Sequence, residues 1–165
     1  MRTSRRTSEK VGALYDAHIA GAVRFAYLVC GDASLAQDLA HDAFVRVTSK
    51  LGALRSQDKV APYLRTAIVN GYRSHLRKLQ RERRYLEKAQ SVRAAEQPDV
   101  AMQRDVREAL QLLPPRRRAA VVLRYYEDMT EQQTADVLGC SVPAVKALVA
   151  RGLDTLRGAL EGEVT

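Results

Sequence analysis

The segment Leu113–Arg157 contains two helix-start signals around a single glycine, and this arrangement limits the possible folds more than any other feature. Thr130, followed by Gln133 three residues later, is a capping-box pattern that begins a first helix. Gly139 suits the turn after that helix, because glycine adopts a positive φ at little cost. Ser141 is a good cap for a second helix. The segment therefore predicts a helix-turn-helix.

The second helix of this unit combines an apolar stripe with a basic outer face. Its apolar residues recur every three or four positions: Val142, Val145, Val149, Leu153 and Leu156. Lys146 and Arg151 fall on the solvent side. A second helix of this kind fits the major groove of DNA. A plain pair of packed helices is the alternative, because helix–glycine–helix sequences are common.

Composition favours an acidic partner and a chain without a membrane anchor. The net charge is +8 over 165 residues, and 46% of the residues are hydrophobic, as in a globular protein. No apolar run of about 18 residues occurs, and the basic N-terminus lacks the apolar stretch of a secretory signal. We therefore expect a cytoplasmic protein without membrane insertion. Cys30 and Cys140 lack metal-ligand spacing, so we expect reduced thiols, no metal and no cofactor.

The first half of the chain shows three amphipathic helices. A flexible basic arm up to Ser8 is followed by helical spacing over Val11–Val29. A second helix, capped by Ser34, has an apolar line over Leu35–Leu51. A third helix starts near residues 58–62 and keeps its apolar spacing to Leu79.

The third helix also has a strongly basic face. Eight basic residues and two acidic ones between Arg65 and Lys88 give this segment a net charge of +6. The face opposite the apolar line contains Arg65, Asn70, Arg73, Ser74, Arg77, Lys78 and Arg81. Such a helix fits a nucleic-acid backbone. A solvated helix surface and a membrane-facing surface are the alternatives.

The second half begins after a stretch without periodicity. Residues 89–103 are rich in alanine and glutamine, which indicates a linker. Helical spacing returns over Val106–Leu113, and another helix follows Pro114-Pro115, with Ala119, Val122, Leu123 and Tyr126 inward. No stretch alternates with a period of two. The chain is therefore predicted to be all-α, with two small helical domains at residues 9–88 and 104–161.

Four segments, taken together and in order, resemble a known family. They are Gly31–Val47, Ala61–Lys78, Leu113–Thr130 and the helix-turn-helix that follows. The chain resembles the extracytoplasmic-function (ECF) sigma factors of the sigma-70 superfamily, which have two conserved domains. The resemblance implies a non-catalytic specificity subunit that binds bacterial core RNA polymerase and promoter DNA. The family is commonly held inactive by an anti-sigma factor, which is therefore a candidate partner.

The resemblance also implies roles for residues of the first domain. The segment that binds polymerase corresponds to Asp38, Leu39, Asp42 and Phe44. The residues expected to bind and melt the −10 element are Arg65, Asn70, Arg73, Arg77 and Lys78, with residues 55–61 as a pocket for a flipped base. Tyr63, Tyr72 and His75 are candidate stacking groups, but their place on the apolar line favours core packing.

In the second domain, the resemblance implies −35 recognition by the last helix. The expected DNA contacts are Arg116, Arg118, Ser141, Lys146 and Arg151, whereas Arg124 suits either DNA or polymerase. The family often has arginine where this chain has Leu148, so one candidate base contact is missing.

Two other classes of function explain less of the sequence. A free-standing repressor or activator would explain the helix-turn-helix but would leave the basic third helix without a role. An enzyme would need a catalytic motif, and neither a phosphate-binding glycine loop nor a metalloprotease signature occurs. Asp38 and Asp42, one turn apart, mimic a metal pair but are better explained as a protein-contact surface.

Overall fold

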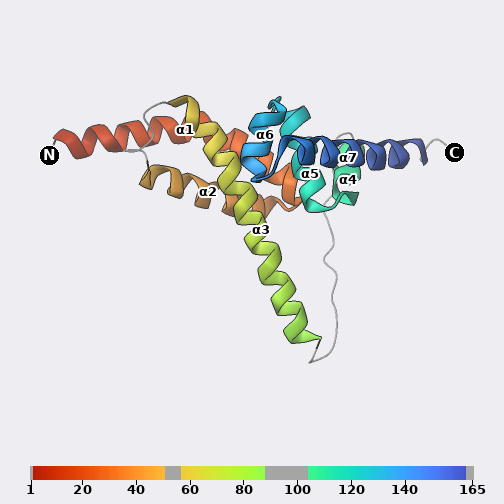
Figure 1. Cartoon of the computed structure of the whole chain (residues 1–165). Coiled ribbons are helices and arrows are strands. Elements are labelled where there is room, and N and C mark those ends of the chain that lie inside the picture. The colour runs from red at the N-terminus through yellow and green to blue at the C-terminus, as the bar shows by residue number, and fades with distance from the viewer. Residues whose placement is uncertain (1, 51–56, 88–103, 163–165) are drawn as a thin grey trace.

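The computed structural model describes residues 2–50, 57–87 and 104–162, and the regular structure in these ranges is entirely helical (Figure 1). The elements are α1 (Arg2–Cys30), α2 (Ala33–Ser49), a 3₁₀ turn η1 (Gln57–Lys59), α3 (Val60–Leu86), α4 (Arg104–Leu112), α5 (Pro115–Val121), a π-helical segment η2 (Val122–Tyr126), α6 (Glu131–Leu138) and α7 (Val142–Gly162). This confirms the all-α prediction. The predicted linker, residues 89–103, lies outside the described ranges.

The start of the chain differs from the prediction in two places. The basic arm is part of α1, which already begins at Arg2. The cap of α2 is Asp32, not Ser34: the Leu35 backbone N–H donates to Asp32 Oδ1 at 2.7 Å. The reason is Gly31, whose φ of 75° ends α1 and leaves Asp32 in the extended conformation that an N-cap requires.

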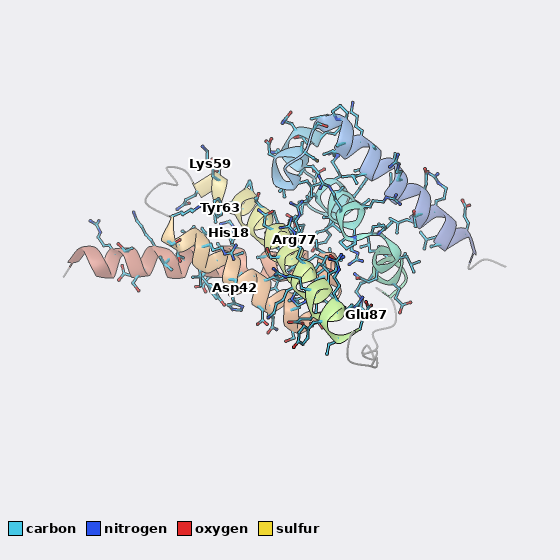
Figure 2. All side chains as sticks on the ribbon, turned by 60° about the horizontal axis from the view of Figure 1, so that its bottom comes forward. His18, Asp42, Lys59, Tyr63, Arg77 and Glu87 are labelled. Atoms are coloured by element: carbon cyan, nitrogen blue, oxygen red, sulfur yellow. The ribbon has the colours of Figure 1, made fainter. Side chains whose placement is uncertain are left out.

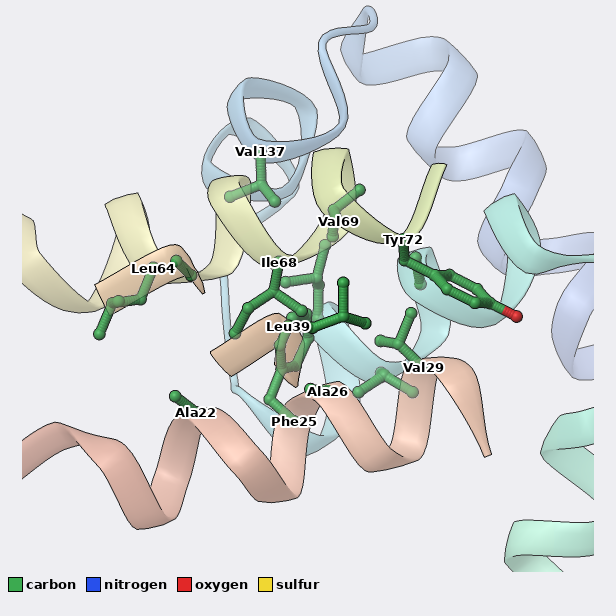
Figure 3. Packing of buried hydrophobic residues seen from close by; sticks show 14 of the residues in the cluster. Ala22, Phe25, Ala26, Val29, Leu39, Leu64, Ile68, Val69, Tyr72 and Val137 are labelled. Carbon is green, nitrogen blue, oxygen red and sulfur yellow. The ribbon is translucent and has the colours of Figure 1, made fainter. Parts of the chain in front are cut away.

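A single hydrophobic core runs through both halves of the chain. Figure 3 shows α3 between two layers, with Phe25 and Val29 of α1 on one side and Val137 of α6 on the other. Ile68 and Val69 of α3 lie between these layers, and both are buried. The two predicted domains are therefore packed against each other along α3.

The helix-turn-helix forms as its sequence predicts. Gln133 N–H donates to Thr130 Oγ1, and Thr130 N–H donates to Gln133 Oε1, at 3.1 and 2.8 Å. Gly139 has φ 62° in the turn, and Ser141 Oγ accepts from the Ala144 N–H at 3.3 Å. The capping box, the glycine turn and the second cap are all confirmed.

The segment before the helix-turn-helix departs from the predicted helical phase. The spacing predicts an inward Tyr126, yet this side chain is 51% exposed. The helix widens into η2, where Glu127 N–H bonds to Val122 O, five residues back. The additional residue in this turn rotates the following side chains relative to an α-helix. Val122 and Leu123 remain buried, whereas Tyr126 turns outward.

Thr134 provides a test of this packing. It is fully buried in α6, and its hydroxyl has no hydrogen-bond partner among the described residues. A buried hydroxyl without a partner is unfavourable, so Thr134→Val should raise the free energy of unfolding by about 1 kcal/mol in urea titrations. Thr134→Ser, which keeps the hydroxyl and removes a methyl group, should lower it. The reverse order would contradict the unpaired hydroxyl.

Candidate nucleic-acid interface

The outer face of α3 presents most of the residues predicted to bind the −10 element. Asn70, Arg77 and Lys78 are exposed, and Arg73 is half-buried. They lie opposite the side that packs on α1, and Arg77 is labelled near the middle of the helix in Figure 2. Lys78 Nζ lies 4.0 Å from Glu82 Oε1, but both side chains are solvated and such a pair is weak. The two exposed cations of this face are therefore available to phosphates.

Arg65 does not belong to this face, so its prediction as a −10 DNA contact is wrong for this arrangement. Its side chain is only 9% exposed, and its Nε lies 2.8 Å from Oε2 of Glu127, which follows η2. The contact is an ion pair without hydrogen-bond alignment at Nε. The guanidinium also lies over the Phe25 ring, 5.2 Å from its centroid. Arg65 therefore joins α1, α3 and the second half of the chain.

The residues implied as a polymerase contact divide between two sides of α2. Asp38 and Asp42 are exposed, whereas Leu39 and Phe44 are buried in the core. The Phe44 ring meets Tyr15 edge-on, with centroids 5.0 Å apart. Leu39 and Phe44 thus orient α2 and are not contact residues in this arrangement, which corrects the prediction.

The exposed side of α2 contains two further features that the sequence prediction missed. Val45 is 65% exposed beside the acidic residues, and only its place off the apolar line signals this. His41 Nδ1 lies 2.7 Å from the Gln37 carbonyl, which can only accept, so this nitrogen is protonated. In the neutral ring, His41 Nε2 then accepts from the Tyr15 hydroxyl at 2.7 Å. This bonding holds the imidazole against α1.

On α7, the predicted DNA-contacting residues are accessible. Ser141, Lys146 and Arg151 are exposed, and so is Arg116 at the start of α5. Lys146 Nζ lies 3.6 Å from Glu131 Oε2, and both side chains are solvated. A solvated ion pair of this kind contributes little to stability, so Lys146 can exchange Glu131 for a phosphate.

Arg118 is the second predicted DNA contact that the structure contradicts. It is buried, and its guanidinium donates to the carbonyls of Val29, Leu110, Gln111 and Leu113 at 2.7–3.2 Å. Three of these carbonyls lie at the end of α4 and one at the end of α1, where helices leave carbonyls without intrahelical partners. Arg118 is therefore a buried cap for two helices and does not reach DNA.

A groove of about 300 Å³ lies between the first turns of α3 and the helix-turn-helix. Lys59, Pro62, Tyr63 and Thr66 line one side, and Met129, Gln133, Asp136 and Val137 line the other. Of the predicted pocket for a flipped base, residues 55 and 56 lie outside the described ranges, and Val60 and Ala61 belong to α3 instead of a loop.

Comparison with known proteins assigns this chain to a family. Residues 14–82 match Sigma-70 region 2, and residues 103–156 match Sigma-70, region 4. RNA polymerase sigma-E factor of Streptomyces avermitilis is 33% identical over 130 residues, which cover 76% of this chain and 71% of that protein. The chain belongs to the ECF sigma factors of the sigma-70 family.

Other relatives agree with this assignment. RNA polymerase sigma-H factor of Pseudomonas aeruginosa is 29% identical over 84% of this chain and 78% of its own length. The sigma factor RpoE from Bartonella quintana, solved in complex with the anti-sigma factor NepR, has a TM-score of 0.73 at 20% identity, covering 93% of this chain and 96% of that one. The latter likeness shows the shared fold.

Family membership confirms several predictions for this sigma factor. It is a non-catalytic subunit of RNA polymerase, with regions 2 and 4 for promoter recognition. Region 2 corresponds to most of α1 with α2 and α3, and region 4 to α4–α7. In the described ranges, no helix is long and apolar enough to cross a membrane, and no cluster of three potential ligands is arranged for a metal ion. Burial raises the pKa of the Cys30 thiol, which favours its protonated, unreactive form.

Proposed function

We propose that this ECF sigma factor reads and melts the −10 element with the outer face of α3 and reads the −35 element with α7. The observation that carries the proposal is the presence of two separate exposed basic surfaces on one chain. A single DNA-binding motif would need only one of them. Boundaries at residues 9–88 and 104–161 for the two DNA-binding halves are part of this proposal.

On α3, the proposed −10 contacts are Asn70, Arg73, Arg77 and Lys78. Holding separated strands requires cations for phosphates and polar groups for unpaired bases, because unstacking costs a few kcal/mol. The three basic side chains supply the charge, and the exposed Asn70 amide supplies both a donor and an acceptor. Arg73 is half-buried where α3 meets α5 and α6, so its full use requires region 4 to move.

On α7, Lys146 and Arg151 are proposed to contact the −35 element. Ser141 and Arg116 lie closer to the ends of their helices, where hydroxyl and guanidinium groups suit phosphates. The outer side of α2 is the proposed polymerase surface, because the exposed Asp38 and Asp42 precede an exposed apolar side chain, Val45, on the same helix.

The proposal is tested by run-off transcription. Core RNA polymerase with this protein should initiate at a promoter from a genomic library on which core polymerase alone does not. Initiation by neither mixture would overturn it. Tight, polymerase-independent binding to duplex operators would instead support a free-standing regulator.

Two substitutions on α7 test −35 recognition. Lys146→Ala and Arg151→Ala should each reduce promoter affinity of the holoenzyme, and the slope of log K against log salt should fall by about one for each phosphate that is no longer bound. If one of these side chains reads a base edge, its removal should also relax the sequence preference. The loss of discrimination against the wrong base would be about 1–3 kcal/mol. The matched control is Arg157→Ala, farther along α7, where Arg157 pairs with Asp154 at 3.2 Å. Equal effects of all three variants would contradict the assignment.

Regulation and location are also part of the proposal. The structural relative RpoE is in complex with an anti-sigma factor, and the present chain shares its fold. We therefore include an anti-sigma factor among its partners, together with a cytoplasmic location beside RNA polymerase. Co-purification from the native host under several growth conditions tests this partner.

A further inference from the structure

A cavity of about 110 Å³ lies where region 4 packs on region 2, and it is partly open to solvent. It is lined by Val29 at the end of α1, by one face of α3 between Val69 and Leu76, by the start of α5 and by Leu138 of α6. We name this space the interface cavity.

The walls of the interface cavity are mainly apolar. Val29, Val69 and Leu138 are buried, and Figure 3 shows the Tyr72 ring beside Val29. Apolar walls offer a water molecule few hydrogen bonds, and apolar cavities of about 150 Å³ stay dry and accommodate a benzene ring. The interface cavity is therefore suited to an apolar group no larger than about one aromatic ring.

Three hydrogen-bond donors belong to the same lining: the Tyr72 hydroxyl and the guanidinium groups of Arg73 and Arg116. Arg73 is half-buried and Arg116 is exposed, which puts both charges toward the solvent side of the cavity. None of these three side chains has a hydrogen bond or an ion pair with another described residue, and none of the described lining residues is acidic. Two unpaired guanidinium groups beside an apolar space suit a carboxylate attached to an apolar group.

The two arginines come from different halves of the chain. Arg73 lies in region 2 and Arg116 in region 4. A carboxylate that accepts hydrogen bonds from both guanidinium groups therefore links α3 to α5. A ligand that needs both halves binds only the packed arrangement and stabilises it by mass action.

We propose that the interface cavity binds a small organic acid, with an apolar group of about one ring in the cavity and the carboxylate between Arg73 and Arg116. Such a ligand holds region 4 on α3 and occupies two of the proposed DNA contacts, so it lowers promoter use. The binding itself is independent of the proposed function, whereas the effect on transcription rests on it.

Binding is tested by titrating the whole chain with benzoate and following the backbone amides by NMR. For a ligand of this size we expect a Kd of about 0.1–1 mM, with the largest shifts at residues 69–76 and 115–119. Benzamide is a neutral molecule of the same shape, and inorganic phosphate is an anion without an apolar group. Each of these two control ligands should bind at least about tenfold more weakly than benzoate.

Two substitutions test the site from the side of the protein. Ala119→Leu places a larger side chain in the cavity and should abolish benzoate binding, with circular dichroism and urea unfolding as checks of its fold. Arg116→Gln keeps the apolar walls, so it should weaken benzoate binding about tenfold and leave benzamide binding unchanged. The adjacent Arg117→Gln, outside the lining, removes the same charge and should bind benzoate as the native chain does.

Three results of the titration would overturn the inference. No binding of benzoate up to about 20 mM, or shifts only at distant residues, would make the cavity a packing defect. Equal affinity for benzamide would show that the arginines do not select an acid. Equal affinity for phosphate would show that they bind anions without help from the cavity.

Run-off transcription separates this inference from the proposed function. At ten times its Kd, benzoate should lower the apparent affinity of this sigma factor for core polymerase and promoter by about tenfold. If benzoate binds in the cavity and transcription does not respond, the effect on promoter use is overturned. If the holoenzyme initiates at no promoter without benzoate, the proposed function fails and this effect fails with it, whereas the binding site is decided by the NMR titration alone.

Discussion

Arg118→Met is expected to lower the free energy of unfolding by about 3–5 kcal/mol, measured by urea unfolding of the whole chain. Methionine keeps most of the volume of the side chain but donates no hydrogen bond. The carbonyls of Val29, Leu110, Gln111 and Leu113 would be left without this donor in a buried region. A decrease of this size is a large part of the roughly 5–15 kcal/mol that stabilises a typical domain.

Two controls separate this role from DNA binding. Arg116→Met removes the same charge at an exposed position two residues earlier and should change stability by no more than about 0.5 kcal/mol. Arg118→Lys keeps the charge but lacks the planar fork, so it should restore only part of the stability. If Arg118→Met left stability unchanged and reduced −35 binding, the structural role would be wrong and the DNA role correct.

The local parts of the fold are predictable because their causes lie within a few residues. The capping box joins Thr130 to Gln133, and the positive φ of Gly139 requires nothing outside the turn. The helical phase of α3 follows from sequence spacing in the same way. That phase alone is enough to place Asn70 and Arg77 on the exposed face.

The burial of Arg65 and Arg118 cannot be predicted in this way, because their partners are distant in the sequence. Arg118 bonds to Val29, and Arg65 pairs with Glu127, across the boundary between the two halves. A signal is nevertheless present. Arg65 stands three residues before Ile68 and seven before Tyr72, which puts it on the apolar line of α3. An arginine at such a position indicates a buried partner, but the sequence does not identify that partner.

The position of region 4 on region 2 depends on such polar contacts as well as on apolar packing. Arg107 of α4 donates to the Tyr27 hydroxyl of α1, and its guanidinium lies 5.1 Å from the centre of that ring. Together with Arg118 and Arg65, it makes a third arginine that joins the two halves. Each of these arginines can form hydrogen bonds with water when the two halves separate. The polar contacts therefore determine how the halves pack but leave their association reversible.

Glu127→Gln is expected to destabilise the packed arrangement by about 3 kcal/mol. The substitution leaves the Arg65 guanidinium buried without a counter-charge, with the side chains of the pair only 9% and 13% exposed. Arg65 regains hydration if region 4 moves away from α3. We therefore expect a lower free energy of unfolding in urea and a larger radius of gyration in small-angle X-ray scattering at low protein concentration.

The decisive control replaces both charges. Arg65→Met/Glu127→Leu removes the ion pair and leaves no unpaired charge, so it should be at least as stable as the native protein, because apolar side chains often replace buried ion pairs without a decrease in stability. Its radius of gyration should stay at the native value. If the double variant is as unstable as Glu127→Gln or less stable, the cation over the Phe25 ring, 5.2 Å away, stabilises the interface more than the ion pair does. Arg65→Lys then distinguishes the two contributions, because lysine keeps the charge and lacks the planar stacking on Phe25.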